Sequence, residues 1–137
     1  MKTKIITAVV EASGTGFSIY VEDENLPLTS YGTTIEEAKN DLDDVLEEMI
    51  VYYKEKKEAL PAAYNNANLK FEFKYDIPSI FAYFGMLDAT NLARKIGMNP
   101  SLLRQYKTKK TLASNKQKQK IEAGLHALGR ELLKVRL

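Results

Sequence analysis

The chain has 137 residues, enough for one ordinary domain or two small ones, and its hydrophobic content of 45% argues against wholesale disorder. The absence of Cys excludes a disulfide framework and thiolate metal sites. The net charge of +2 conceals an asymmetry, because residues 1–75 carry eight Lys/Arg against fourteen Asp/Glu, whereas residues 76–137 carry twelve against four. This division favours two modules with different partners, the basic one suited to a polyanion, over a drift of surface charge along one domain.

The N-terminus has a basic start, but its apolar run covers only Ile5 to Val10 and includes Thr7. A secretory signal needs a longer apolar stretch, and a membrane-spanning helix needs about 18 apolar residues. We therefore expect a soluble, cytoplasmic protein with no membrane partner.

The acidic half begins with two strand-like runs, "KIITAVVEA" and "GFSIYVED". β-Branched and aromatic runs joined through Ser13 to Gly16 predict a β-hairpin. Alternation places Phe17, Ile19 and Val21 on one face of the second strand. The turn-rich stretch that follows leaves room for a short third strand around residues 28–31.

A long helix is predicted next, because Thr34 and Glu37 form a capping-box pattern. We expect this helix to end at Pro61. Its apolar stripe consists of Ile35, Ala38, Leu42, Val45, Met49 and Tyr52. The segment "NLKFEFKY" then alternates as a last strand, with Leu69, Phe71, Phe73 and Tyr75 on one face. The order β-β-β-α-β predicts a small sheet covered on one face by one helix.

This order, and above all the segment "LTSYGTTIEEAKNDLDDVL", resembles the HicB-type antitoxin domain over roughly residues 3–75. The family shows a strand, then Gly-x-Thr, then a helix that opens with Glu-Glu-Ala, on a truncated ribonuclease-H-like fold. Of the Pro-Asp-Leu-Pro-Gly-like turn that the family usually carries after its second strand, only Leu26-Pro27 is present. The resemblance implies that this module binds a HicA-like toxin, a small basic RNA-cleaving protein. An acidic module suits such a partner because opposite charge speeds association.

A ribonuclease-H-like module could also be a divalent-metal nuclease, which needs several carboxylates converging on the ions. The acids at 22–24 are sequential, so alternate side chains point to opposite faces of a strand. Asp41, Asp43 and Asp44 are typical of the solvated side of a helix. The single histidine, His126, has apolar neighbours and is more typical of a structural residue than of a base. We therefore predict no catalytic residue, no metal site and no cofactor, and rank the nuclease last.

The basic half shows a series of helix start signals. Pro78 can open a short helix that ends near Gly85, and Asp88 can cap a second. Asn99 followed by Pro100 predicts the start of a third. A second capping box, Ser114 and Gln117, predicts a final helix with the apolar stripe Ile121, Leu125, Leu128, Leu132 and Val135.

The middle pair of helices has the pattern of a helix-turn-helix. A small residue, Ala93, stands where the helices must touch, and Gly97 suits the tight turn. Apolar side chains fill the positions that the motif buries, namely Leu92, Ile96, Met98, Leu103 and Tyr106. With the trailing helix, this block resembles the lambda-repressor-like (XRE/Cro) domains that some HicB antitoxins carry at their C-terminus.

A recognition helix places its N-terminal side chains on base edges in the major groove. The candidate base-reading residues face away from Leu103 and Tyr106. They are Asn99, Ser101, Arg104, Gln105 and Thr108. The candidate phosphate contacts are Lys107, Lys109 and Lys110, with Lys116, Lys118 and Lys120 beyond. The alternative is a helical bundle with a solvated cationic face.

The expected fold class is α+β: a β-β-β-α-β ribonuclease-H-like sheet module in residues 1–75, then an all-α lambda-repressor-like helix-turn-helix domain in residues 76–137. The resemblance implies an antitoxin that neutralises a HicA-like toxin and represses its own operon by binding double-stranded operator DNA. We expect a homodimer or higher homo-oligomer, since such proteins read two-fold operators. The alternative is a stand-alone transcriptional regulator whose N-terminal domain dimerises or senses a ligand.

Overall fold

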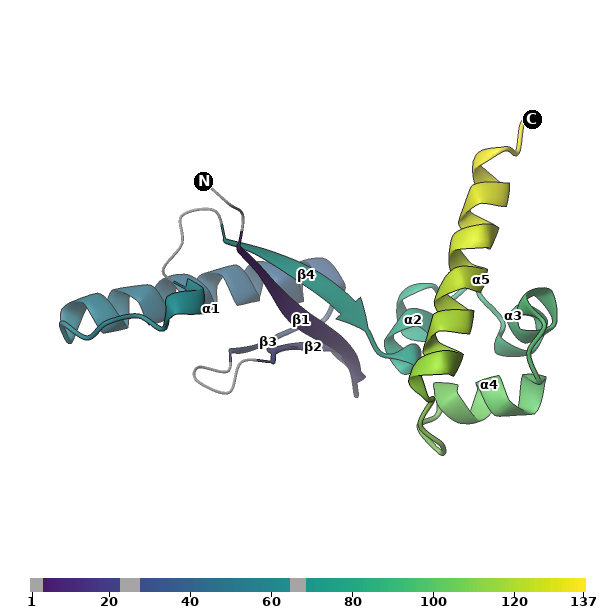
Figure 1. Cartoon of the computed structure of the whole chain (residues 1–137), viewed down its shortest axis with the longest axis horizontal. Helices are drawn as coiled ribbons and strands as arrows, with labels where there is room; N and C mark the ends of the chain where they lie inside the picture. The colour runs from purple at the N-terminus through teal and green to yellow at the C-terminus, as the bar shows by residue number, and fades with distance from the viewer. Residues whose placement is uncertain (1–3, 23–27, 65–68) are drawn as a thin grey trace. The chain divides into compact units, whose positions relative to one another are not determined.

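The computed structural model describes residues 4–22, 28–64 and 69–137. Contacts divide the chain into two compact units, one up to Tyr83 and the other from Phe84 onward. Within the described residues the fold is mixed α+β, with one four-stranded sheet and five α-helices (Figure 1). None of these helices combines the length and the apolar character that crossing a membrane requires.

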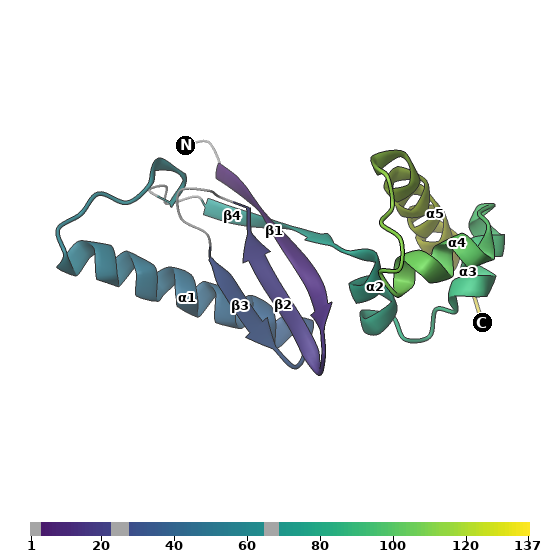
Figure 2. The same ribbon diagram turned by 90° about the horizontal axis from the view of Figure 1, so that it is seen from below.

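The first unit is built on a mixed sheet with the strand order β3-β2-β1-β4 (Figure 2). Its strands are β1 (Lys4–Ser13), β2 (Gly16–Val21), β3 (Thr29–Gly32) and β4 (Leu69–Tyr75). β1, β2 and β3 pair antiparallel in sequence, whereas β4 runs parallel to β1. The predicted hairpin is confirmed, with Ser13 paired to Gly16 and Gly14 at φ 48°. The turn that contains Leu26-Pro27 lies outside the described residues, as do Asp23 and Glu24.

Helix α1 (Ile35–Glu55) covers one face of the sheet (Figures 1 and 2). The predicted alternation of β2 is confirmed, because Phe17, Ile19 and Val21 are buried in the core that α1 completes. The alternation of β4 is confirmed as well, since its four odd-numbered side chains pack against the same core. The predicted stripe of α1 is buried at Ile35, Ala38 and Leu42, but its last member, Tyr52, is 53% exposed.

The start of α1 explains why the sequence places glycine before two threonines. A Cβ on Gly32 would stand 2.4 Å from the backbone N of Ala38, so only glycine allows β3 to approach α1 this closely. The Thr34 hydroxyl accepts from the backbone N–H of Glu37 at 3.1 Å, as a capping box requires. The Glu37 carboxylate, however, accepts from the backbone N–H of Thr33 at 2.9 Å, one residue before the N-cap.

The end of α1 differs from the prediction. The helix stops at Glu55, and Lys57 has φ 54° in the left-handed region, so the chain leaves the helix before Pro61. The reason is packing, because the last turn of α1 presents no side chain to the buried core. A 3₁₀ turn, η1 (Ala62–Tyr64), follows and buries Tyr64 in the sheet unit.

Helix α2 (Ile77–Tyr83) groups with the sheet unit. The backbone N–H of Asp76 donates to the carbonyl of Val10 in β1 at 3.0 Å, and the Asp76 carboxylate caps α2 by accepting from Ser79 N–H at 2.8 Å. At the other end, the Tyr83 hydroxyl donates to the Glu36 carboxylate at 3.0 Å. The division between the units therefore lies eight residues after the point where the charge changes sign.

The second unit contains α3 (Ala89–Ile96), α4 (Pro100–Lys107) and α5 (Asn115–Leu133). All three predicted N-caps are confirmed: Asp88, Asn99 and Ser114 each accept from a backbone N–H in the first turn of the helix that they precede. The second capping box is only half formed, since the side-chain oxygen of Gln117 is buried and has no hydrogen-bond partner among the described residues.

The apolar stripe of α5 is covered only in part. Ile121 is buried and Leu125 and Leu128 are half-buried, but Leu132 is 62% exposed. Val135, also 62% exposed, was predicted on this helix but lies beyond its end at Leu133. The cause is the short length of the neighbouring helices, because α3 has eight residues against nineteen in α5.

Candidate nucleic-acid interface

Helices α3 and α4 pack against each other through a connection of three residues. Gly97 ends α3 in the left-handed conformation, with φ 74°. A residue with a side chain would be strained in this conformation. Ala93 is fully buried, as a close contact between the helices requires. Four of the five apolar positions predicted to be buried are so, and the fifth, Ile96, is half-buried. The local geometry of the pair therefore follows the sequence pattern.

Two of the candidate base-reading residues, Ser101 and Arg104, lie exposed on α4, opposite buried Leu103 and Tyr106. The guanidinium of Arg104 donates through Nη1 to the hydroxyl of Thr90, in the first turn of α3, at 2.8 Å. This bond holds one edge of the guanidinium and leaves its other N–H groups for a ligand. Arg104 is therefore oriented by α3 before any partner binds.

The other three candidates have local roles. The Asn99 carboxamide caps α4 by accepting from Ser101 N–H at 2.9 Å. Gln105 is half-buried, and its side-chain oxygen accepts from the hydroxyl of Thr111 at 3.0 Å. The Thr108 hydroxyl bonds to the carbonyl oxygens of its own helix, at 3.2 Å from that of Arg104. These bonds use the amide oxygens of Asn99 and Gln105 and the hydroxyl hydrogen of Thr108, and they leave the amide N–H donors for a ligand.

The candidate phosphate contacts Lys107, Lys109 and Lys110 are all exposed at the end of α4. Lys109 has φ 61°, in the left-handed region that ordinary side chains avoid. Among the more distant lysines, Lys120 is used structurally, because its Nζ donates to the carbonyl of Gly97 at 2.9 Å and so satisfies the end of α3. Lys116 and Lys118 are exposed in the first turn of α5.

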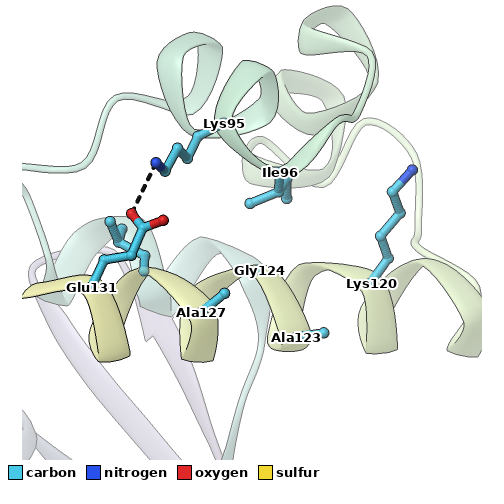
Figure 3. A pocket seen from close by; sticks show the side chains of 8 residues that line it. Lys95, Ile96, Lys120, Ala123, Gly124, Ala127 and Glu131 are labelled. Atoms are coloured by element: carbon cyan, nitrogen blue, oxygen red, sulfur yellow. Dashed lines mark ion pairs between the residues drawn. The ribbon is translucent and has the colours of Figure 1, made fainter.

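Helix α5 braces the pair through close contact with α3 (Figure 3). A Cβ on Gly124 would stand 2.3 Å from the Cγ2 atom of Ile96, so glycine is required at this crossing. Lys95 Nζ lies 2.9 Å from the Glu131 carboxylate, which ties the end of α3 to the last turns of α5. A groove of about 420 Å³ between them is lined mainly by small or long flexible side chains.

Sequence reasoning missed two contributors, Thr90 and Thr111. Each acts through a single hydrogen bond to a residue 14 or 6 positions away, which neither periodicity nor a capping pattern reveals. The only signal for Thr90 is its place in the first turn of a helix adjoining the candidate recognition helix.

The charge of the second unit is compatible with a polyanionic ligand. Within residues 4–22, 28–64 and 69–137, no three His, Cys, Asp or Glu side chains come close enough together to hold a metal ion. The second unit carries twelve Lys/Arg against three Asp/Glu, so its field attracts polyanions. Comparison with protein-family models, with curated proteins and with solved structures finds no match to this chain.

Proposed function

We propose that this protein is an antitoxin of the HicAB type. Its first unit binds and neutralises a HicA-like mRNA-cleaving toxin encoded in the same operon, and its second unit represses that operon by binding operator DNA. The observation that carries the proposal is the α3–α4 pair, whose buried side fits the helix-turn-helix pattern and whose exposed side presents Ser101 and an oriented Arg104. The acidic charge of the first unit, with fifteen Asp/Glu against eight Lys/Arg, supports binding of a cationic partner by that half.

The geometry supports α4 as the helix that enters the major groove. Arg104 can donate two hydrogen bonds to the O6 and N7 atoms of guanine, and Ser101, one turn nearer the N-terminus of α4, can contact a neighbouring base. The lysines at the end of α4 supply phosphate contacts, which set register and salt dependence but not sequence preference.

The first experiment is a titration of DNA from the protein's own promoter, alongside unrelated DNA of equal length. Arg104→Ala should weaken promoter binding by about 1–3 kcal/mol and leave binding to unrelated DNA almost unchanged. The matched control is Arg130→Ala, which removes the same charge from exposed α5. Equal losses for both variants on both DNAs would show that α4 does not read sequence.

Thr90 provides a second and subtler variant. Thr90→Val removes the hydroxyl that accepts from Arg104 but keeps the shape and charge of the surface. We expect a loss at the promoter that is smaller than that of Arg104→Ala, because the guanidinium is still present but no longer held. In Arg104→Ala, adding Thr90→Val should have no further effect on binding.

The second experiment tests the antitoxin half. The product of the adjacent reading frame should arrest growth when it is induced alone, and co-expression of this protein should restore growth and allow both chains to be purified together. Restoration without co-purification would point to an indirect effect. An adjacent product that neither arrests growth nor binds would favour a stand-alone transcriptional regulator.

A further inference from the structure

The outward side of α1 carries six residues at the spacing of one helix face. They are Asp44, Glu47, Glu48, Val51, Tyr52 and Glu55, which we call the acidic stripe. At 3.6 residues per turn, five of the six lie on the side of the helix roughly opposite the buried residues Ile35, Ala38 and Leu42, and Tyr52 lies at the edge of the stripe, nearer to Ala38. The acidic stripe therefore faces away from the sheet.

The acidic stripe includes two exposed apolar side chains, Val51 within it and Tyr52 at its edge. Val51 and Tyr52 are each 53% exposed, and with Ile50 and the four carboxylates they line a shallow groove on the surface of α1. A solvated face is ordinarily polar throughout, and exposed apolar residues rimmed by polar ones mark interaction sites. Tyrosine in such a place often carries a large share of binding energy.

The charge of the acidic stripe indicates what kind of partner fits it. Among the described residues, none of its four carboxylates lies in an ion pair. The whole first unit carries fifteen Asp/Glu against eight Lys/Arg, so its field attracts cations. The ring of Tyr52 makes a cation–π contact within α1 and its C-cap, since the Lys56 Nζ lies 5.9 Å from the ring centre. A lysine or arginine of a partner could replace Lys56.

We propose that the acidic stripe is the docking surface for a cationic protein, which seats an apolar side chain against Val51 and Tyr52 and pairs its cations with the surrounding carboxylates. The inference rests on the proposed function, in which that partner is the toxin encoded in the same operon. It adds where on the first unit the toxin binds, which the resemblance to HicB antitoxins leaves open.

The test measures the affinity of the purified full-length protein for the adjacent gene product at two salt concentrations. Glu48→Lys and Tyr52→Ala should each weaken the complex by about tenfold or more, and Glu48→Lys should also reduce the salt dependence. The control is Glu72→Lys, an equal charge reversal at an exposed position of β4, on the side of the sheet away from α1. Thermal unfolding should be nearly the same for all variants, because the altered side chains are exposed.

The possible outcomes separate the docking surface from the proposed function. Stripe variants that bind as tightly as the unaltered protein would overturn the docking surface and leave the antitoxin function standing. Failure of the unaltered protein to bind would overturn both. If sedimentation then showed that the stripe variants separate a dimer, the occupant of the stripe would be a second copy of this chain.

Discussion

Two glycines of α5 illustrate how one atom can have opposite effects in the same helix. Gly124→Ala places a Cβ 2.3 Å from Ile96, so overpacking of about 1–3 kcal/mol should outweigh the better helix propensity of Ala. Gly129→Ala meets nothing within 4 Å and should stabilise the protein by about 0.5–1 kcal/mol. Urea unfolding of both variants gives the comparison. Equal gains for both would mean that α3 and α5 do not cross at Gly124.

Lys109 offers a residue at which stability and binding should move in opposite directions. Its left-handed backbone, with φ 61°, costs about 1 kcal/mol that glycine would not incur. We therefore expect Lys109→Gly to raise the free energy of unfolding and, by removing a proposed phosphate contact, to weaken binding to every DNA. The control Lys110→Ala should weaken DNA binding similarly without a gain in stability. A variant that gains in both respects would remove Lys109 from the DNA interface.

The stability that Glu37 contributes at the start of α1 should depend on pH. The hydrogen bonds from Thr33 lower the pKa of the Glu37 carboxyl below its ordinary value of 4.5. A carboxyl with a lowered pKa in the folded state contributes stability above its unfolded pKa, and this contribution is lost as the pH falls through the folded value. The stability difference between the protein and Glu37→Gln should therefore be present at pH 7 and shrink below pH 4.5. Urea unfolding across this pH range checks the prediction, with Glu47→Gln, the same substitution at an exposed position of α1, as the control.

At the scale of elements, the sequence predicted what short-range chemistry controls. Side-chain caps at Thr34, Asp88, Asn99 and Ser114 act within three residues, and alternation in β2 and β4 needs only the strand itself. The ends of elements were predicted less well, because the end of α1 depends on which of its residues pack against the sheet, and the helix pattern alone does not show this. The bond between Arg104 and Thr90 could not be predicted at all, since it joins two helices whose relative placement the pattern does not give.

Helix α2 belongs to the first unit, so a fragment of that unit should include it. The backbone of Asp76 is hydrogen-bonded to β1, and Tyr83 donates a hydrogen bond to Glu36 and packs edge-on against the ring of Phe17. A fragment that ends at residue 83 should therefore have a higher urea midpoint than one that ends at residue 75. The same reasoning predicts that Asp76→Ala in the whole chain costs about 1 kcal/mol through the lost cap. Identical midpoints for the two fragments would show that α2 does not stabilise the sheet.

At the scale of the whole molecule, two units of opposite charge predict two separable activities. Under the proposed function, Arg104→Ala should release repression of a reporter driven by the protein's own promoter, because it removes the exposed side chain that we propose reads bases. It should still rescue growth when the toxin is induced from an unrelated promoter, since no residue of the first unit has changed. Glu48→Lys should do the reverse, repressing the reporter but failing to rescue. Arg130→Ala and Glu72→Lys are the charge-matched controls and should retain both activities. If Arg104→Ala lost rescue while the protein stayed at its normal cellular level, the two activities would not be divided between the units, and toxin binding would have to involve α4.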